Sequence, residues 1–123
     1  MAKKIMIVDD EVAAVHIAKL VLKRHGYEVV EAYSGEGCLE KIKEEKPDLI
    51  LLDVMMPKID GWEVLRRIKE NEELKAIPVV MLTVKPLNAE TLKRKEMGYL
   101  SDYVIKPFSK EDLIACVREV LGP

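Results

Sequence analysis

Several features that would assign a protein to a broad functional class are missing from this 123-residue chain. Charges of the two signs are balanced, with 20 Lys and Arg against 22 Asp and Glu and a net charge of -2. The sequence therefore offers no basic surface for nucleic acid or for an anionic membrane. The first apolar run, residues 5–8, is too short for a signal peptide or a membrane span. We expect a cytoplasmic protein without direct contacts to nucleic acid or membrane.

Cysteine is also scarce. The chain has two cysteines, Cys38 and Cys116, which lie within apolar helical patterns and match no metal-binding or redox spacing. We expect both to be reduced core residues. No repeat, linker or low-complexity tract interrupts the chain, and its length fits a single domain over residues 1–123 with no effector domain.

The most informative segment is residues 49–61. Four consecutive aliphatic residues, 49–52, lead into Asp53, and Pro57 and the pair Asp60-Gly61 follow. This pattern predicts a strand that is buried on both faces and runs into a loop. Asp53 then lies at the carboxyl end of the strand, where open parallel sheets bind their ligands. An acid that only caps a turn is the alternative interpretation of Asp53 on this segment alone.

Strand and helix patterns alternate five times along the chain with short connections. This alternation predicts an α/β fold with a doubly wound, five-stranded parallel sheet of flavodoxin-like order 2-1-3-4-5 flanked by five helices. The expected strands cover 5–8, 28–32, 49–53, 79–83 and 103–105; the expected helices run from 12 to a stop at 26, between 35 and 47, from about 61 to 70, after an N-cap at 88, and after a capping box at 109–112 until 122.

In that topology, polar residues that end the strands meet in one crevice: Asp9, Asp10, Asp53, Thr83 and Lys106. Three close carboxylates would raise one another's pKa unless a cation compensated them. Oxygen ligands without histidine or sulfur favour Mg²⁺. Three aspartates, one Mg²⁺ and one lysine sum to zero charge, which leaves a site that can accept a phosphoryl group. Asp53 could then act as a nucleophile, with charge from Lys106 and a hydrogen bond from the Thr83 hydroxyl.

Taken together, these residues resemble the receiver domain of two-component response regulators, a CheY-like family, over the whole chain. The matching motifs are the acidic pair Asp9-Asp10, the phosphoacceptor Asp53 at the start of 53–61, the hydroxyl of Thr83, and the run 106–108. The resemblance implies phosphorylation of Asp53 by a sensor histidine kinase or a phosphotransfer protein. It also implies that the chain catalyses only its own phosphorylation and slow dephosphorylation, and is not a turnover enzyme.

The resemblance further implies a set of metal ligands. Asp10, Asp53, the backbone carbonyl of Met55 and, partly through water, Asp9 would hold Mg²⁺ or Mn²⁺. A cis peptide bond is implied at 106–107, between Lys106 and Pro107, a position where only a prolyl bond makes the cis form accessible.

Tyr103 falls at the position of the family's switch aromatic. Phosphorylation would draw Thr83 toward the phosphoryl group and turn Tyr103 inward, and this would remodel the surface of helix 4, strand 5 and helix 5 for a protein partner. A strand tyrosine with its hydroxyl in water is the alternative interpretation of Tyr103. We expect a monomer or a weak dimer through that surface, whose basic run, 93–95, is a solvated helix face or a docking site for an acidic partner.

Two departures from the family pattern are visible. Val84 stands where a small residue is usual after the hydroxyl, and its branched side chain could crowd the acceptor. The segment 98–102 is one residue longer than usual and carries Tyr99 at a position where a small residue is common.

Three other functions remain as alternatives. A haloacid-dehalogenase-type phosphatase would need a second Asp two positions after the nucleophile, where this chain has Met55. A flavin carrier of the same topology would need a Gly- and hydroxyl-rich phosphate loop after the first strand, where this chain has the acidic run 9–11. A receiver-like module that binds proteins without phosphorylation is the closest competitor, and the complete acidic triad argues against it.

Overall fold

The computed structural model describes residues 2–83 and 98–122. These residues form five strands and four helices, which confirms the predicted alternation. Their bounds are β1 Lys4–Val8, α1 Val12–Arg24, β2 Glu28–Ala32, α2 Gly35–Glu45, β3 Leu49–Asp53, α3 Gly61–Lys69, β4 Val79–Thr83, β5 Asp102–Ile105 and α5 Lys110–Leu121. The predicted helix after Asn88, the basic run 93–95 and Val84 lie outside the described residues.

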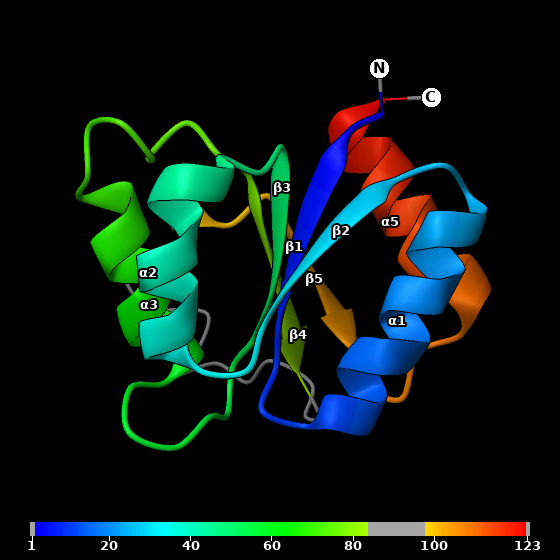
Figure 1. Ribbon diagram of the computed structural model, residues 1–123, viewed down its shortest axis with the longest axis horizontal. Coiled ribbons are helices and arrows are strands. Elements are labelled where there is room, and N and C mark those ends of the chain that lie inside the picture. Colours follow the sequence, from blue (N-terminus) through cyan, green and yellow to red (C-terminus); the bar gives the residue numbers. More distant parts are fainter. Residues whose placement is uncertain (1, 84–97, 123) are drawn as a thin grey trace.

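The five strands form one parallel sheet in the order β2-β1-β3-β4-β5, as the alternation predicts. Helices α2 and α3 cover one face, and α1 and α5 cover the other (Figure 1). The chain is therefore a doubly wound, CheY-like α/β fold. The carboxyl ends of all five strands point to the same edge of the sheet, because the strands are parallel.

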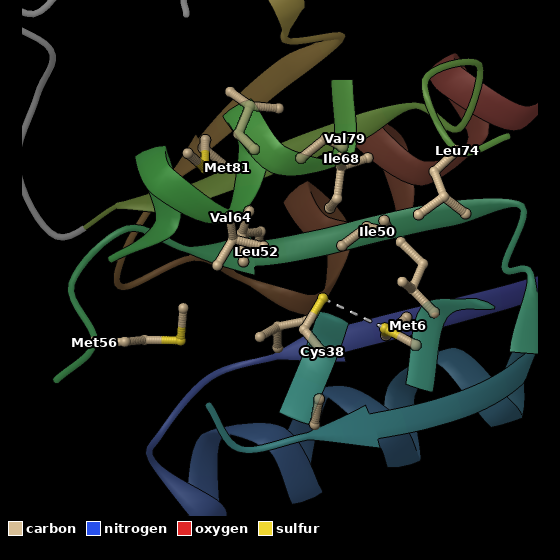
Figure 2. Packing of buried hydrophobic residues seen from close by; sticks show 14 of the residues in the cluster. Met6, Cys38, Ile50, Leu52, Met56, Val64, Ile68, Leu74, Val79 and Met81 are labelled. Atoms are coloured by element: carbon tan, nitrogen blue, oxygen red, sulfur yellow. Dashed lines mark hydrogen bonds between the residues drawn. The ribbon is translucent and has the colours of Figure 1, made fainter. Parts of the chain in front are cut away.

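Two apolar clusters hold the helices to the sheet. Alternate residues of the central strands β1 and β3 point to opposite faces, so each strand contributes to both clusters. On the α2 and α3 face, Cys38 from α2 packs on Met6 from β1, with 3.8 Å between the two sulfur atoms (Figure 2). Cys38 and Cys116 are both buried and free, as predicted, and burial raises the pKa of each thiol to about 12, so neither is a reactive thiolate at neutral pH.

Specific side chains fix the starts of two helices. The Ser34 side chain accepts a hydrogen bond from the Gly37 amide at the start of α2. Ser109 and Asp112 form the predicted capping box at the start of α5. After α1, Gly26 takes a positive φ of 89°, a conformation that favours glycine. These caps fix where each helix begins or ends relative to the strand beside it.

The edge strand β2 is less buried than the centre of the sheet. Its outer side is crossed by the side chain of Lys41 from α2, whose Nζ donates a hydrogen bond of 2.5 Å to the backbone carbonyl of Glu31. The Glu31 carboxylate in turn forms an ion pair with Lys19 of α1. Charged side chains therefore connect both neighbouring helices to this edge.

Helix α1 carries apolar residues on its exposed side as well as on its buried side. Val12 and Leu20 are 64% and 51% exposed. The buried face is formed by Val15, Ala18 and Leu22. Apolar residues occur nearly all around this helix, so their spacing alone did not identify the buried face.

Candidate functional site

The four polar strand ends meet as the topology predicts. Asp9 follows β1 and its amide donates to the carbonyl of Ala32 in β2, at 3.1 Å. Asp53 is the last residue of β3 and Thr83 the last of β4. Lys106 follows β5, and its amide donates to the carbonyl of Thr83 at 2.6 Å. Backbone hydrogen bonds of the sheet therefore hold these residues at one edge.

The three carboxylates form the cluster that the sequence predicts. Asp9, Asp10 and Asp53 each offer an oxygen, and these oxygens lie within 4.8 Å of one another. Asp9 and Asp53 are buried, at 2% and 5% exposure, whereas Asp10 is exposed. Among the described residues this is the one group of three or more acids, histidines or cysteines with the spacing of a metal site.

Lys106 supplies positive charge to this cluster. Its Nζ lies 2.6 Å from Asp9 Oδ2 and 3.4 Å from Asp53 Oδ1. Burial by itself lowers the pKa of Lys106, but the bonds to Asp9 and Asp53 outweigh it, so the pKa is raised and the lysine stays charged. The peptide bond between Lys106 and Pro107 is cis, as the family resemblance implied.

One lysine does not balance three aspartates, and the excess charge falls on Asp53. Burial, reinforced by the negative charge of Asp9, raises the pKa of the Asp53 carboxyl from 3.8 to about 6, although Lys106 acts in the opposite direction. Asp9 is held differently, because its Oδ1 also accepts the Glu11 amide at 3.0 Å. Near neutral pH Asp53 is therefore an ionised but poorly stabilised carboxylate, and such a group gains from added positive charge.

Carboxylate oxygens without nitrogen or sulfur ligands are the donor set that Mg²⁺ prefers. The unbalanced charge of the cluster fits a divalent cation for the same reason. Met55 follows Asp53 by two residues in the loop after β3 and is 64% exposed.

Sequence reasoning missed how closely helix α3 approaches the end of β3. The amide of Gly61 donates to the Val54 carbonyl at 2.8 Å. A Cβ atom at Gly61 would lie 2.4 Å from the backbone oxygen of Asp53, so no larger residue fits without moving the backbone. Asp60 caps α3 through the Glu63 amide at 3.0 Å. The Asp60-Gly61 pair indicated only a turn in the sequence, and nothing in it revealed this contact.

Two further predicted residues lie on β4 and β5. Thr83 is buried, with 8% exposure. Tyr103 pairs with Met81 in the sheet and its side chain is 40% exposed. The Tyr103 amide donates a hydrogen bond of 2.8 Å to the carboxylate of its neighbour Asp102, so the side chain of Asp102 covers that part of the strand edge. Tyr99, one of the departures from the family pattern, is partly buried against the apolar cluster on the α2 and α3 face.

The fold and the acidic site define a class of signalling protein, and sequence comparison agrees. The family model of the response regulator receiver domain matches residues 5–118. The chain therefore belongs to the response regulator receiver domain family. Receiver domains are phosphorylation-activated signalling modules that interact with histidine kinases or phosphotransfer proteins, and they generally bind Mg²⁺ through acidic residues.

Solved structures resemble the chain over nearly its whole length. The N-terminal domain of a response regulator receiver protein from Methanoculleus marisnigri JR1 has 42% identity and a TM-score of 0.80, with 98% of this chain and 97% of that chain covered. A putative response regulator from Chloroflexus aurantiacus J-10-fl has 32% identity and a TM-score of 0.89, with both chains fully covered. The chemotaxis protein CheY4 of Vibrio cholerae has 28% identity and a TM-score of 0.91, with 98% of this chain and 100% of that chain covered.

No helix among the described residues is long and apolar enough to cross a membrane.

Proposed function

We propose that Asp53 is the phosphoacceptor of this receiver and that its phosphorylation requires a divalent cation. One observation carries the proposal: three carboxylates have oxygens within 4.8 Å of one another, and a single lysine, Lys106, pairs with two of them, Asp9 and Asp53. Such an arrangement is costly unless a bound cation compensates the negative charge, and the same cation can then interact with a phosphoryl group. Phosphoryl transfer needs positioning and charge stabilisation, and the site offers both.

In the proposed reaction, a carboxylate oxygen of Asp53 forms a bond to the phosphorus of a phosphohistidine on a kinase or phosphotransfer protein. The phosphorus–nitrogen bond breaks, and the imidazole leaves with the electron pair and takes a proton. Asp9, Asp10, Asp53 and the Met55 carbonyl would hold Mg²⁺ or Mn²⁺, which supplies positive charge to the phosphoryl oxygens when bound. Lys106, which pairs with Asp9 and Asp53, would supply further positive charge to the site.

Later hydrolysis of the acyl phosphate by water would return Asp53 to its original state. The chain then modifies only itself and turns over no external substrate. Thr83 and Tyr103 would change position in response to phosphorylation, since Thr83 lies at the end of β4 and Tyr103 lies on the adjacent β5. A hydrogen bond from the Thr83 hydroxyl to the phosphoryl group would favour the inward position of Tyr103 and change the exposed side of β5.

The test is the intact mass of the protein after incubation with Mg²⁺ and acetyl phosphate. We expect the chain with its original sequence to gain one phosphoryl group. The Asp53→Asn variant should gain none, and neither should the original chain in the presence of a chelator. Asp48→Asn serves as the matched control. Asp48 directly precedes β3, at the end of the β1 and β3 pair that lies opposite Asp53, and its carboxylate accepts a hydrogen bond from the Lys4 amide. This variant should gain the phosphoryl group normally.

Absence of labelling in the unmodified chain would have two explanations, which Val84→Ala separates. If the branched side chain crowds the acceptor, the smaller residue should restore labelling. If the Val84→Ala variant also gains no phosphoryl group, the proposal is wrong and the chain is a receiver-like module that binds its partner without phosphorylation.

A further inference from the structure

The outward face of helix α1 is unusually apolar. Val12, Ile17 and Leu20 are 64%, 63% and 51% exposed, and they are three of the seven exposed large hydrophobic residues among the described residues. Ala13 and His16 are exposed beside them. Single exposed hydrophobic residues are ordinary, but a contiguous apolar face on one helix indicates an interaction surface.

The spacing of this face fits a second helix. Ala13, Ile17, Leu20 and Arg24 follow one another at intervals of four, three and four residues, which places them in one row along α1. Rows with this spacing pack along another helix, where large side chains enter the gaps of the facing row. Ala13 is small and provides such a gap, whereas Ile17 and Leu20 provide the large side chains.

The charges at the two ends of α1 determine the direction in which a second copy of α1 could pack on it. Two exposed acids, Asp10 and Glu11, stand directly before the helix, and two basic residues, Lys23 and Arg24, form its last turn. A helix with the same charges fits only in the antiparallel direction, because each basic end then faces an acidic end. The chain itself supplies such a helix.

We propose that α1 is a self-association surface on which a second copy of this chain packs its own α1 in the antiparallel direction. The two-fold axis passes near Ile17, so that the two Ile17 side chains meet at the centre. Each Leu20 then lies opposite the Ala13 region of the other copy, and each basic turn lies beside the other copy's Glu11. Every contact occurs twice, as a two-fold dimer requires.

This surface differs from the predicted surface of helix 4, strand 5 and helix 5, although α1 contacts α5. The outward face of α1 belongs to a helix that packs against β1 and β2, whereas β5 is the opposite edge of the sheet (Figure 1). The inference therefore does not rest on phosphorylation of Asp53. A single pair of helices buries less area than a standard protein interface, so we expect a weak dimer with a dissociation constant on the order of 100 μM.

Sedimentation equilibrium of the purified chain tests the proposal. Over about 10 μM to 1 mM, which brackets a weak interface, the average mass should rise from monomer toward dimer. Ile17→Glu should raise the dissociation constant at least about tenfold, because each dimer contains the substitution twice at its centre. The matched control is Ile105→Glu on β5, a similarly exposed isoleucine at 42%, which should associate like the unmodified chain. Circular dichroism should show that both variants stay folded.

Charge reversal tests the antiparallel direction. Glu11→Lys should weaken association, and so should the double substitution Lys23→Glu with Arg24→Glu. The three substitutions combined should restore association, because the basic and acidic ends then meet again with exchanged signs. Glu11 makes no side-chain cap to α1, so its replacement removes no capping bond.

Three results would overturn the proposal. The first is a monomeric mass at every concentration, which would leave the apolar face to a different protein. The second is association that persists unchanged in Ile17→Glu. The third is association lost in Ile105→Glu but kept in Ile17→Glu, which would assign self-association to the β5 surface. Labelling with acetyl phosphate should be the same in Ile17→Glu and the unmodified chain, so failure here is distinct from failure of the phosphoacceptor.

Discussion

The two ends of strands β1 and β3 carry their charges in opposite ways. At the amino ends, the Lys4 amide donates to Asp48 at 2.7 Å and the Lys4 Nζ pairs with Glu45 at 3.2 Å. The Lys4 and Glu45 side chains are 30% and 38% exposed, so water shares in their solvation. At the carboxyl ends, Asp9 and Asp53 are nearly inaccessible and share one lysine, Lys106, while Asp10 adds a third carboxylate beside them.

This difference shows which end of the strands lowers the stability of the folded state. The amino ends are arranged for stability at the surface, where ion pairs contribute little and cost little. The carboxyl ends concentrate buried negative charge, which destabilises the chain until a ligand compensates it. Such an imbalance is a mark of a functional site. Three substitutions and the addition of Mg²⁺ test this contrast, from the largest expected effect to the smallest.

Gly61→Ala should be the most damaging change at the carboxyl end. The new methyl group would lie 2.4 Å from the Asp53 backbone oxygen, so β3 and α3 must separate. We expect a loss of about 2–4 kcal/mol in the free energy of unfolding, measured with urea. Gly37→Ala is the control, since its methyl group would meet only the Ser34 hydroxyl at 3.1 Å and the change should stay within about 1 kcal/mol. Equal losses in both variants would contradict the proposed close contact.

Removal of the lysine at each end compares the two charge arrangements directly. Lys106→Met leaves three carboxylates without a cation, and we expect it to cost about 2–3 kcal/mol of unfolding free energy in a metal-free buffer. Lys4→Met removes a partly exposed pair and should cost less than about 1 kcal/mol. Both are measured by urea unfolding at pH 7.5. If Lys4→Met lowers the free energy of unfolding as much as Lys106→Met does, the charges at the two ends of the strands contribute equally to stability and the proposed contrast is wrong.

Asp53→Asn should stabilise the protein when no metal is present. The folded carboxyl has a pKa of about 6 against 3.8 for the ordinary group, so the folded state binds more protons between these values. Stability of the unmodified chain therefore falls as the pH rises through this window, and the full cost is present above pH 6. The asparagine variant avoids this cost, so its advantage should grow from near zero below pH 4 to about 1–3 kcal/mol at pH 7.5.

Thermal unfolding across pH measures this advantage, and Asp48→Asn provides the control. Asp48 accepts the Lys4 amide, so its replacement should bring no stabilisation that grows with pH. An advantage of Asp53→Asn that is constant from pH 4 to 7.5 would argue against a raised pKa of Asp53.

Added Mg²⁺ should have the smallest effect on the free energy of unfolding, because it only compensates part of the negative charge at the carboxyl ends. A ligand at ten times its dissociation constant stabilises the folded state by about 1.4 kcal/mol. We expect a rise in the unfolding temperature of the unmodified chain with Mg²⁺ that a chelator reverses. The rise should be lost in Asp9→Asn and kept in Asp48→Asn, and a rise of the same size in Asp9→Asn would exclude the acidic cluster as the site.

Much of this arrangement could be predicted from the sequence because each part has a local cause. The apolar run 49–52, followed by Asp53 and turn residues, predicts a buried strand, and parallel topology then brings Asp53 beside Asp9. Lys106 could be placed for the same reason. These predictions depend on patterns that do not change when neighbouring elements shift by a fraction of an ångström.

Other features depend on three-dimensional packing that no local pattern encodes. The contact at Gly61 follows from the distance between β3 and α3. Lys106 pairs more closely with Asp9 than with Asp53, and the two distances from its Nζ to the carboxylate oxygens differ by less than one ångström. The exposed face of α1 was ambiguous because apolar residues surround the helix.

The hydrogen bonds on the outer sides of β2 and β5 have a further consequence. An open edge strand is a template onto which another chain can add its own strand and begin to aggregate. Here the side chain of Lys41 occupies the Glu31 carbonyl on one edge, and the side chain of Asp102 occupies the Tyr103 amide on the other. Charged groups thus block part of both templates, which discourages growth of the sheet from one molecule to the next. Recognition of other proteins is left to helix faces and side chains, where contacts can form and dissociate without extending the sheet.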